Sequence, residues 1–365
     1  MRAVFRVDAS VRIGSGHVMR CLTLSRALAR RGWEVTFVCR AHPGNLSSQI
    51  IAQGIEVSLL PMRARARERG NRYADWLGGE WEEDASSTAE TFGRDGEPEL
   101  LVVDHYAIDQ RWERTFRQAG ITVMAIDDLA DRTHDCDVLL DQNYYTDLET
   151  RYGKLVPFDA LRLLGPRYAL LREEFLSEPG VARSRGEAVG RILVFFGGVD
   201  SSNATSKAIA ALVATRRPDI EVDVVVGGGN PNRDRIEALC AQQPRFRFHC
   251  QTSRMASLMA RADLAIGAGG TTTWERAFMG LPSLVMSVAE NQVRAAKDVH
   301  DYGAHIYLGR SEDVDVSTLK AALERIISSD GLPAMSHAAR ALMGGRFFVG
   351  ADGVAELVVA RTSDG

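Results

Sequence analysis

Apolar residues follow two alternating patterns along this chain. Short, largely apolar runs at 3–7, 34–39 and 99–103 predict strands. The third run is continuous in apolar residues from Leu100 to Val103, as strands of a parallel sheet are because both of their faces are covered. Between such runs, stretches such as 21–29 place apolar residues at the spacing of a helix that buries one face. The alternation predicts repeated strand–helix–strand units, and therefore an α/β protein with doubly wound, Rossmann-like parallel sheets.

The alternation occurs twice, which predicts two domains that face each other across a cleft. We expect a first Rossmann-like domain at 1–176 and a second at 191–365. Residues 177–190 are rich in Gly, Ser, Glu and Arg, as interdomain linkers often are. The last helical pattern, 353–361, lies within the second range but is also a candidate to pack back on the first domain.

Composition narrows the class of partner and the compartment. The 365 residues carry a formal net charge of −4, so there is no basic excess to neutralise a nucleic acid. The five cysteines form no CxxC pair, which fits a reducing compartment and gives no zinc signature. Charged residues interrupt the N-terminal apolar run, and no run approaches the length of a membrane span. We therefore expect a cytoplasmic protein with neither a membrane nor a nucleic-acid partner; its oligomeric state is not indicated.

A glycine loop follows the first predicted strand. Gly14 and Gly16 flank Ser15, and His17 comes next, at the predicted start of the first helix. Glycines allow a ligand to approach the backbone, and a helix N-terminus disfavours a protonated imidazole. A neutral histidine facing a ligand can take a proton from water, so His17 is a candidate general base.

The same loop has two other interpretations. Glycines at 14 and 16 can begin a dinucleotide site, but Met19 and Arg20 stand where that motif needs its third glycine. The second predicted strand also ends without the acidic residue that such sites use. The other interpretation is that His17 serves only to stabilise the start of the helix.

Polar residues follow three further strands of the first half, which predicts that they gather at one edge of the sheet. They are Asp104-His105-Tyr106, Asp127-Asp128 and Asp141-Gln142-Asn143. His105 is an alternative base, although it can simply pair with the adjacent Asp104. Asp127, Asp128 and Asp131 could be taken for a metal site, but an aspartate after a strand is commonly a turn residue.

In the second half, a strand leads into Gly267-Ala-Gly-Gly-Thr-Thr-Thr-Trp-Glu275. Glycines followed by threonines at the start of a helix offer backbone N–H groups and hydroxyls to a diphosphate. Glu275 follows within the same helix and can accept both hydroxyls of a ribose. The alternative is an ordinary helix start that happens to carry a glutamate.

This stretch resembles the nucleotide-binding segment of GT-B glycosyltransferases, in particular the MurG-like group that uses UDP-sugars. Together with five other segments it resembles a narrower family, the PseG family of UDP-2,4-diacetamido-2,4,6-trideoxy-β-L-altropyranose hydrolases in pseudaminic acid biosynthesis. Those segments are Gly14–His17, Asp104–Tyr106, Tyr168–Phe175, Phe196–Asp200 and Ala289–Gln292. The resemblance extends from Arg2 to about Tyr307.

The resemblance implies a GT-B fold, UDP bound by the C-terminal domain, and transfer of the sugar to water. It implies that His17 activates or positions the water, and that Tyr106 and Asn291 line the reaction centre. We expect these three residues to be catalytic, with no cofactor and no metal. The residues expected to bind the UDP-sugar substrate are Gly14, Gly16, Gly198, Gly269, Gly270, Thr271, Thr272 and Glu275.

Two other functions stay open. A MurG-like transferase would use a sugar or lipid acceptor in place of water. A nucleotide-sugar-binding protein would carry out no turnover. Release of UDP from substrate alone separates the three, because the transferase needs its acceptor and the binding protein releases nothing.

Overall fold

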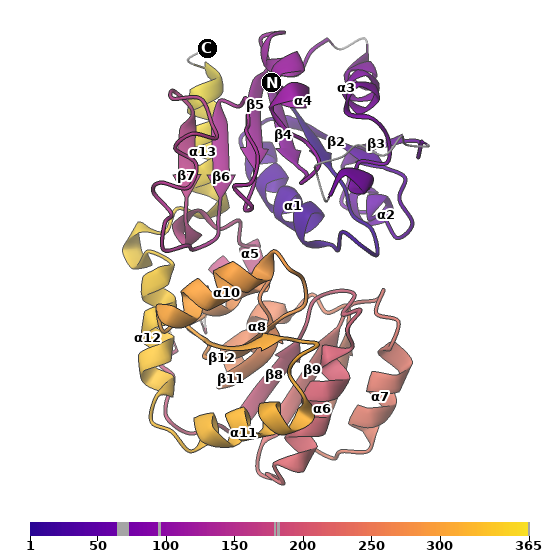
Figure 1. The fold of residues 1–365 in the computed structure, drawn as a ribbon. Helices are drawn as coiled ribbons and strands as arrows, with labels where there is room; N and C mark the ends of the chain where they lie inside the picture. The colour runs from indigo at the N-terminus through magenta and orange to yellow at the C-terminus, as the bar shows by residue number, and fades with distance from the viewer. Residues whose placement is uncertain (64–72, 94–95, 179, 181–182, 364–365) are drawn as a thin grey trace. The chain divides into compact units, whose positions relative to one another are not determined.

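The computed structural model describes residues 1–63, 73–93, 96–178, 180 and 183–363, and forms two compact units (Figure 1). The first unit comprises Met1–Asn143, Asp147–Leu170 and Val349–Gly365. The second comprises Tyr144–Thr146 and Leu171–Phe348. Each contains one parallel sheet with helices on its faces, so the predicted α/β class is confirmed.

The first unit is built on a seven-stranded parallel sheet in the order β3-β2-β1-β4-β5-β6-β7. Its strands are β1 (Arg2–Val7), β2 (Glu34–Arg40), β3 (Glu56–Leu60), β4 (Leu100–Asp104), β5 (Thr122–Ile126), β6 (Val138–Asp141) and β7 (Leu161–Leu164). Because β4, β5 and β6 are neighbours, their carboxyl ends meet at one edge. The polar residues that follow them therefore share that edge, as predicted.

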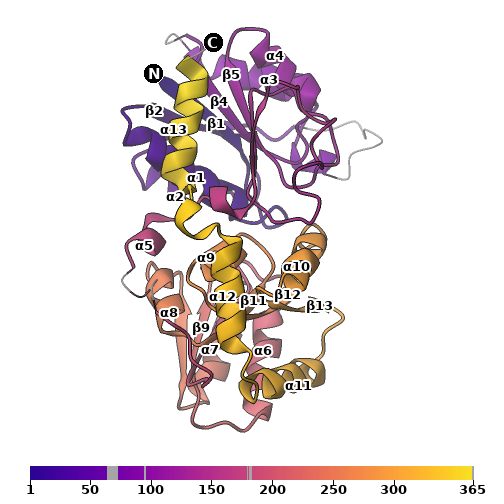
Figure 2. The same ribbon diagram turned by 90° about the vertical axis from the view of Figure 1, so that its left-hand side faces the viewer.

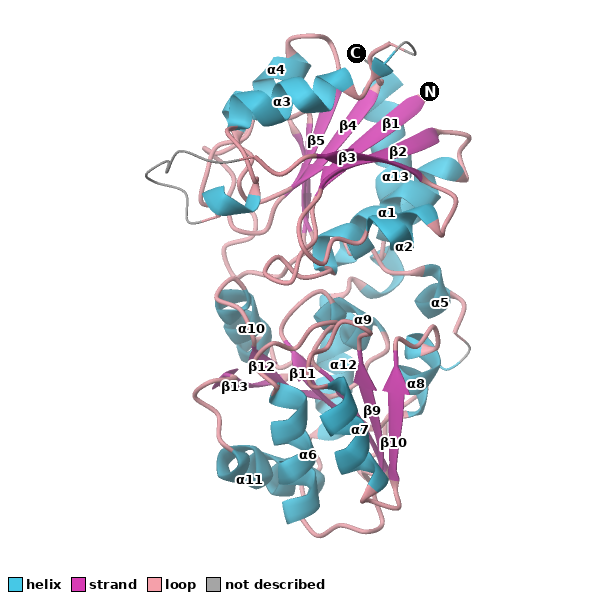
Figure 3. Cartoon of the chain, turned by 90° about the vertical axis from the view of Figure 1, so that its right-hand side faces the viewer, coloured by secondary structure: helices cyan, strands magenta, loops and turns pink. Residues whose placement is uncertain are grey.

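Helices cover both faces of this sheet. Helices α1 (Gly16–Ala29) and α13 (Gly350–Ser363) lie side by side on one face, as Figure 2 shows. Helices α3 (Trp81–Glu90) and α4 (Gln110–Arg117) lie on the other face (Figure 3). Side chains alternate between the faces along β1, so Phe5 packs with α1 and α13 while Val4 packs on the opposite side. Helix α2 (Ser47–Ile51) precedes β3.

The second unit repeats the arrangement with a six-stranded parallel sheet in the order β10-β9-β8-β11-β12-β13. Its strands are β8 (Arg191–Phe195), β9 (Glu221–Val226), β10 (Phe246–Cys250), β11 (Leu264–Ala268), β12 (Ser283–Ser287) and β13 (Ile306–Arg310). The helices are α5 (Glu173–Leu176), α6 (Ala204–Ala214), α7 (Arg233–Ala241), α8 (Met255–Arg261), α9 (Thr272–Phe278), α10 (Gln292–Asp301), α11 (Val316–Ile327) and α12 (Leu332–Leu342). Helices α6, α7 and α11 pack on one sheet face, and α5 and α8 on the other.

The two units differ from the predicted division in three places. Helix α13 completes the core of the first unit, whereas the range 191–365 assigned it to the second, because Val354 and Val358 pack beside α1. Residues 171–176 pack with the second unit through Phe175. The described part of the predicted linker 177–190 also packs there: the Arg185 guanidinium donates to backbone carbonyls of the α8 segment. Residues 179, 181 and 182 of that linker lie outside the described residues.

One predicted helix is divided. Residues 73–92 carry spaced apolar and small residues, a pattern that predicts a single helix. The chain instead forms a 3-10 turn at Ala74–Trp76 and then α3. Gly78 separates them with φ +66°, a backbone conformation that an α-helix cannot include.

Candidate functional site

His17 lies in the first turn of α1, where the glycine loop after β1 directs the chain into the helix. Gly14 adopts φ +83°, and its N–H donates to the carbonyl of Ser10, which closes the loop tightly. Gly16 is the first residue of the helix. The His17 side chain is largely buried, with 9% of its surface exposed.

Asp104 holds the histidine. Its Oδ1 lies 2.6 Å from Nδ1 of His17, which favours the tautomer with a proton on Nδ1 and a free electron pair on Nε2. Arg20, on the next turn of α1, donates to both oxygens of Asp104 from Nε at 2.6 Å and Nη2 at 2.7 Å. Burial alone would raise the pKa of Asp104, but Arg20 and then His17 outweigh burial and hold this pKa below its ordinary value. Asp104 is therefore a carboxylate, not a carboxylic acid.

Tyr106 contacts the other side of the histidine. The two rings are perpendicular, with centroids 4.7 Å apart, and the ring of Trp76 stacks on Tyr106 at 5.6 Å. The tyrosine hydroxyl donates to Oδ1 of Asp128 at 2.6 Å. Burial, and then the negative charge of Asp128, raise the pKa of Tyr106 well above its ordinary value. Two residues predicted as catalytic, His17 and Tyr106, are thus brought into contact.

The alternative base, His105, is buried in a different environment. Its Nδ1 accepts from the backbone N–H of Ala107, and its Nε2 lies 3.2 Å from Asp8. The expectation that it pairs with the adjacent Asp104 is wrong, because successive side chains of an extended segment point in opposite directions. Asp104 turns toward α1, and His105 turns toward the Asp8 side.

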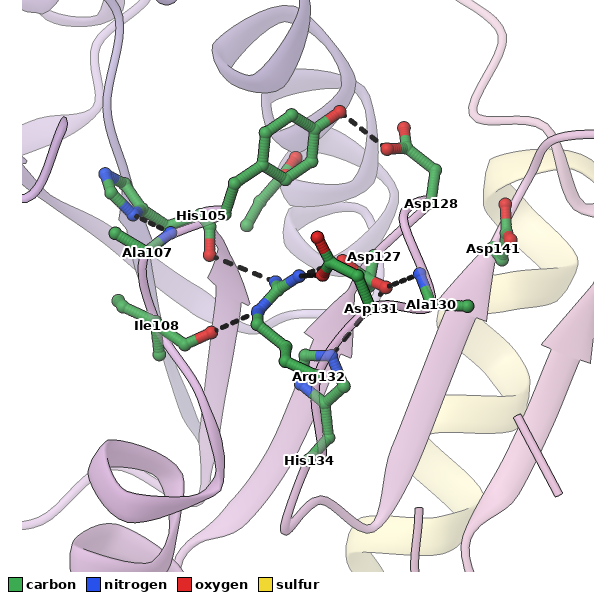
Figure 4. Close-up of polar contacts among 12 residues, drawn as sticks. His105, Ala107, Ile108, Asp127, Asp128, Ala130, Asp131, Arg132, His134 and Asp141 are labelled. Carbon is green, nitrogen blue, oxygen red and sulfur yellow. Dashed lines mark hydrogen bonds and ion pairs between the residues drawn. The ribbon is translucent and has the colours of Figure 1, made fainter. Parts of the chain in front are cut away.

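Asp127 and Asp128 have separate partners (Figure 4). Asp127 accepts from Arg132 at 2.7 Å, from the N–H of Ala130 and from the hydroxyl of Tyr152. Burial would raise its pKa, but Arg132 and His134 outweigh burial and hold the pKa well below the ordinary value. Among the residues that the structure describes, no group of three or more His, Cys, Asp and Glu side chains is arranged to hold a metal ion.

In the second unit, the predicted diphosphate loop connects β11 to α9. Gly269 passes close to α10, since an added Cβ would lie 3.4 Å from the Cβ of Ala296 and of Gln292. Thr271 occupies the N-cap position and Thr272 the first helical turn. The first N–H groups of any helix lack intrahelical partners, so both threonines lie where an anion can accept from the backbone. Gly270 completes this turn beside the Gln292 amide.

Glu275 is buried on α9 and meets Arg172. Its Oε1 accepts from Nε of Arg172 at 3.0 Å, while its Oε2 is buried with no hydrogen-bond partner within the described part of the chain. Burial raises the pKa of Glu275, and Arg172 offsets only part of this effect. A buried carboxylate oxygen without a hydrogen-bond partner in the protein calls for an explanation, such as a bound water or ligand.

Asn291 occupies the N-cap position of α10, and the side chain of the neighbouring Gln292 accepts from the N–H of Val288. Gly198 lies in the turn after β8 and faces Gly227, where an added Cβ would lie 2.2 Å from the Gly198 carbonyl oxygen. The second unit thus brings Gly269, Gly270, Thr271, Thr272 and Glu275 onto one loop and helix, while Asn291 begins the next helix after β12.

Sequence patterns did not identify three residues that form hydrogen bonds with Asp104, Tyr106 and Glu275. In the sequence, Arg20 stands where a dinucleotide motif needs a glycine, Asp128 is one candidate metal ligand, and Arg172 lies within a segment that resembles the PseG family. The spacing of Arg20 three residues after His17, one helical turn, is the signal that could have identified it.

Comparison with known proteins bears on the fold of the chain and on its second domain. Residues 191–345 match the glycosyltransferase family 28 C-terminal domain. The spore coat polysaccharide biosynthesis protein SpsG of Bacillus subtilis is 34% identical over 193 residues, which are 52% of this chain and 55% of SpsG. The UDP-2,4-diacetamido-2,4,6-trideoxy-beta-L-altropyranose hydrolase of Campylobacter jejuni is 26% identical over 269 residues, 73% of this chain and 84% of that protein.

Solved structures share the fold at low sequence identity. MurG of Acinetobacter baumannii superposes with a TM-score of 0.64 at 15% identity, covering 98% of this chain and 99% of MurG. The glycosyltransferase SsfS6 of Streptomyces sp. SF2575 gives 0.64 at 15%, covering 99% of each chain. No helix within the described residues is both long and apolar enough to cross a membrane. The chain therefore has two parallel-sheet α/β domains with the GT-B fold, and its second domain is similar to the C-terminal domain of glycosyltransferase family 28.

Proposed function

We propose that this protein hydrolyses a UDP-linked 2,4-diacetamido-2,4,6-trideoxy sugar, the altropyranose derivative, to UDP and the free sugar. The observation that carries the proposal is the 2.6 Å contact between His17 Nδ1 and Asp104. Support for the substrate class comes from the similarity to the Campylobacter jejuni hydrolase, whose name specifies this UDP-sugar. The segments that resemble the PseG family include the loop that carries His17.

His17 is the general base of this reaction. With its Nδ1 proton donated to Asp104, the imidazole has its basic electron pair on Nε2. Nε2 takes a proton from water while the water oxygen attacks the anomeric carbon. The bond between that carbon and the bridging oxygen breaks, and the oxygen leaves with UDP. Tyr106 packs against the imidazole and limits its rotation.

The second unit binds the nucleotide in this proposal. Backbone N–H groups at Thr271 and Thr272, with the Asn291 amide, stabilise the charge that grows on the β-phosphate. Glu275 accepts from the ribose through Oε2, while Arg172 holds Oε1. Gly14, Gly16, Gly198, Gly269 and Gly270 allow the substrate to approach the backbone.

The test is turnover of the UDP-sugar in H₂¹⁸O with no acceptor. We expect UDP and free sugar in equal amounts, with the label in the sugar. Label in the UDP phosphate would mean attack at phosphorus and would exclude the proposed mechanism. NMR of the products from a panel of UDP-sugars identifies the preferred sugar.

A glycosyltransferase is the second candidate. The match of residues 191–345 favours this second function, because the matched domain belongs to a family of glycosyltransferases rather than hydrolases. In this case UDP appears only after a sugar or lipid acceptor is added. The same experiment, run with and without acceptor, separates the two activities.

A further inference from the structure

We propose that Arg20 is a positioning residue for the His17–Asp104 pair: it fixes the carboxylate that orients the imidazole and is itself anchored by Asp128. This inference rests on the proposed function, since it concerns the same base. Arg20 and His17 are one turn apart on α1, so both side chains leave the helix on the face directed at the end of β4.

The first step of the argument is the fork between Arg20 and Asp104. Nε donates to Oδ2 at 2.6 Å, and Nη2 donates to Oδ1 at 2.7 Å, so the guanidinium engages both carboxylate oxygens. Two parallel hydrogen bonds fix the plane of a carboxylate, whereas one bond leaves it free to rotate. Oδ1 is also the atom that faces Nδ1 of His17. The two hydrogen bonds from Arg20 therefore fix the position of Oδ1, which accepts from Nδ1 of His17.

The second step is the anchor of Arg20. Its third nitrogen, Nη1, donates to Oδ2 of Asp128 at 3.1 Å. Oδ1 of Asp128 accepts from Tyr106, whose ring contacts the ring of His17. The contacts form a closed circuit from His17 through Asp104, Arg20, Asp128 and Tyr106 back to His17. The imidazole is thus held at a nitrogen from one side and on its ring from the other.

The third step is the choice of residue. Only a guanidinium carries nitrogens that can form a fork to one carboxylate and reach a second carboxylate at the same time. The Arg20 side chain is 4% exposed, and its charge is matched by two buried carboxylates. Lysine would keep the positive charge but could not form both hydrogen bonds of the fork. Arg20→Lys therefore distinguishes the effect of the charge from the effect of the paired hydrogen bonds.

The first measurement determines the tautomer of the His17 imidazole in the absence of substrate. Long-range ¹H–¹⁵N spectra of the full chain report the tautomer of each histidine, and His17→Gln assigns the signal of His17. We expect a single Nδ1–H tautomer in the wild type and a mixture of tautomers in Arg20→Met and Arg20→Lys. The matched control is Arg40→Met, which removes a buried arginine of the same unit that pairs with Asp84 instead. An unchanged His17 spectrum in both Arg20 variants would overturn the inference.

The second measurement uses UDP release from the altropyranose substrate. Arg20→Met should lower kcat by about 10- to 100-fold with KM within a few-fold, as when an outer partner of a functional histidine is removed. Added guanidinium should restore part of kcat in Arg20→Met but not in Arg40→Met. A structural ion pair alone would lower thermal stability and leave kcat of the folded fraction unchanged, which would also overturn the inference.

The two measurements keep the inference distinct from the proposed function. If the wild type releases no UDP, the proposed function fails while the tautomer spectra still decide the role of Arg20. If Arg20→Met does not fold, Asp128→Asn tests the same circuit, because it keeps side-chain volume and removes the charge that anchors Nη1. A wild-type tautomer in a folded Asp128→Asn variant, together with wild-type kcat, would exclude the anchor.

Discussion

Asp104 Oδ1 lies 2.6 Å from His17 Nδ1 although the two residues are separated by 87 positions in the chain. The contact follows from topology, because β1 and β4 are adjacent parallel strands. The helix that follows β1 therefore starts at the edge where β4 ends. The proposed base and the carboxylate that contacts it therefore come from the ends of two neighbouring strands of the sheet.

Replacing His17 with glutamine should remove the base and keep the fold of the loop. We expect kcat to fall by roughly 10²- to 10⁴-fold, the usual contribution of a positioned base. UDP affinity, measured by calorimetry, should change little because the nucleotide contacts are proposed on the second unit. Turnover within a few-fold of the wild type would remove His17 from the mechanism.

Replacing Glu275 with alanine should weaken nucleotide binding more than it slows the reaction. The proposed ribose contact is equal in the ground and transition states, so its loss raises KM rather than lowering kcat. Calorimetry with UDP should show a loss of about 1–3 kcal/mol, as for a hydrogen bond to a charged group.

Glu174→Gln is the matched control for that experiment, because Glu174 is the second carboxylate bound by Arg172. It should leave UDP affinity close to that of the wild type. Equal losses in both variants would mean that Arg172, rather than the Glu275 carboxylate, sets the affinity.

His134 should make the stability of the first unit sensitive to alkaline pH. Burial alone would lower the pKa of His134, but Glu113 and Asp127 raise it from 6.5 to about 9. A pKa that is higher in the folded state stabilises the protein fully below pH 6.5, and the contribution is lost as pH rises toward 9. The effect should reach a few kcal/mol, since each pKa unit corresponds to about 1.4 kcal/mol.

Urea unfolding of the wild type and His134→Gln, followed between pH 6 and pH 9.5, measures this effect. The difference in unfolding free energy between the two proteins should shrink across that range, which separates His134 from other groups that titrate there. A difference that is constant with pH would contradict the assignment.

Hydrolysis should continue in excess EDTA. Asp127 is committed to Arg132, Ala130 and Tyr152, and Asp128 to Arg20 and Tyr106. The phosphate charge is instead met by the N–H groups at Thr271 and Thr272 in the proposed mechanism. Loss of UDP release in EDTA, with recovery on adding Mg²⁺ or Mn²⁺, would make Asp127 and Asp128 candidate metal ligands and contradict the proposed mechanism.

The sequence predicts which residues lie at the carboxyl edge of the first sheet, because strand ends and glycine loops are local signals. His17 was predicted in the first turn of its helix, and Asp104, Asp127 and Asp141 at the ends of neighbouring strands. The pairing of Asp104 was not predictable in the same way. It depends on which strand lies beside β1 and on which side of the chain each residue points.

Other misses have the same origin in tertiary contacts. Strand β7 is short and half-buried, so its apolar run is too weak to be distinguished from a loop. In the sequence, Arg20 cannot be distinguished from an ordinary polar residue of a helix. Its two carboxylate partners come from distant segments, the end of β4 and the residues after β5. A contact between distant segments leaves no periodic signal in the sequence.

Helix α13 has a consequence for the order in which the protein matures during synthesis. The core of the first unit includes Val354 and Val358, which the ribosome adds after all of Leu171–Phe348. The second unit can therefore complete its own core while the first still exposes the apolar side chains of α1 on which α13 will pack. During that interval the nascent chain presents an apolar surface, so the first half of the protein is the part that depends on protection from aggregation.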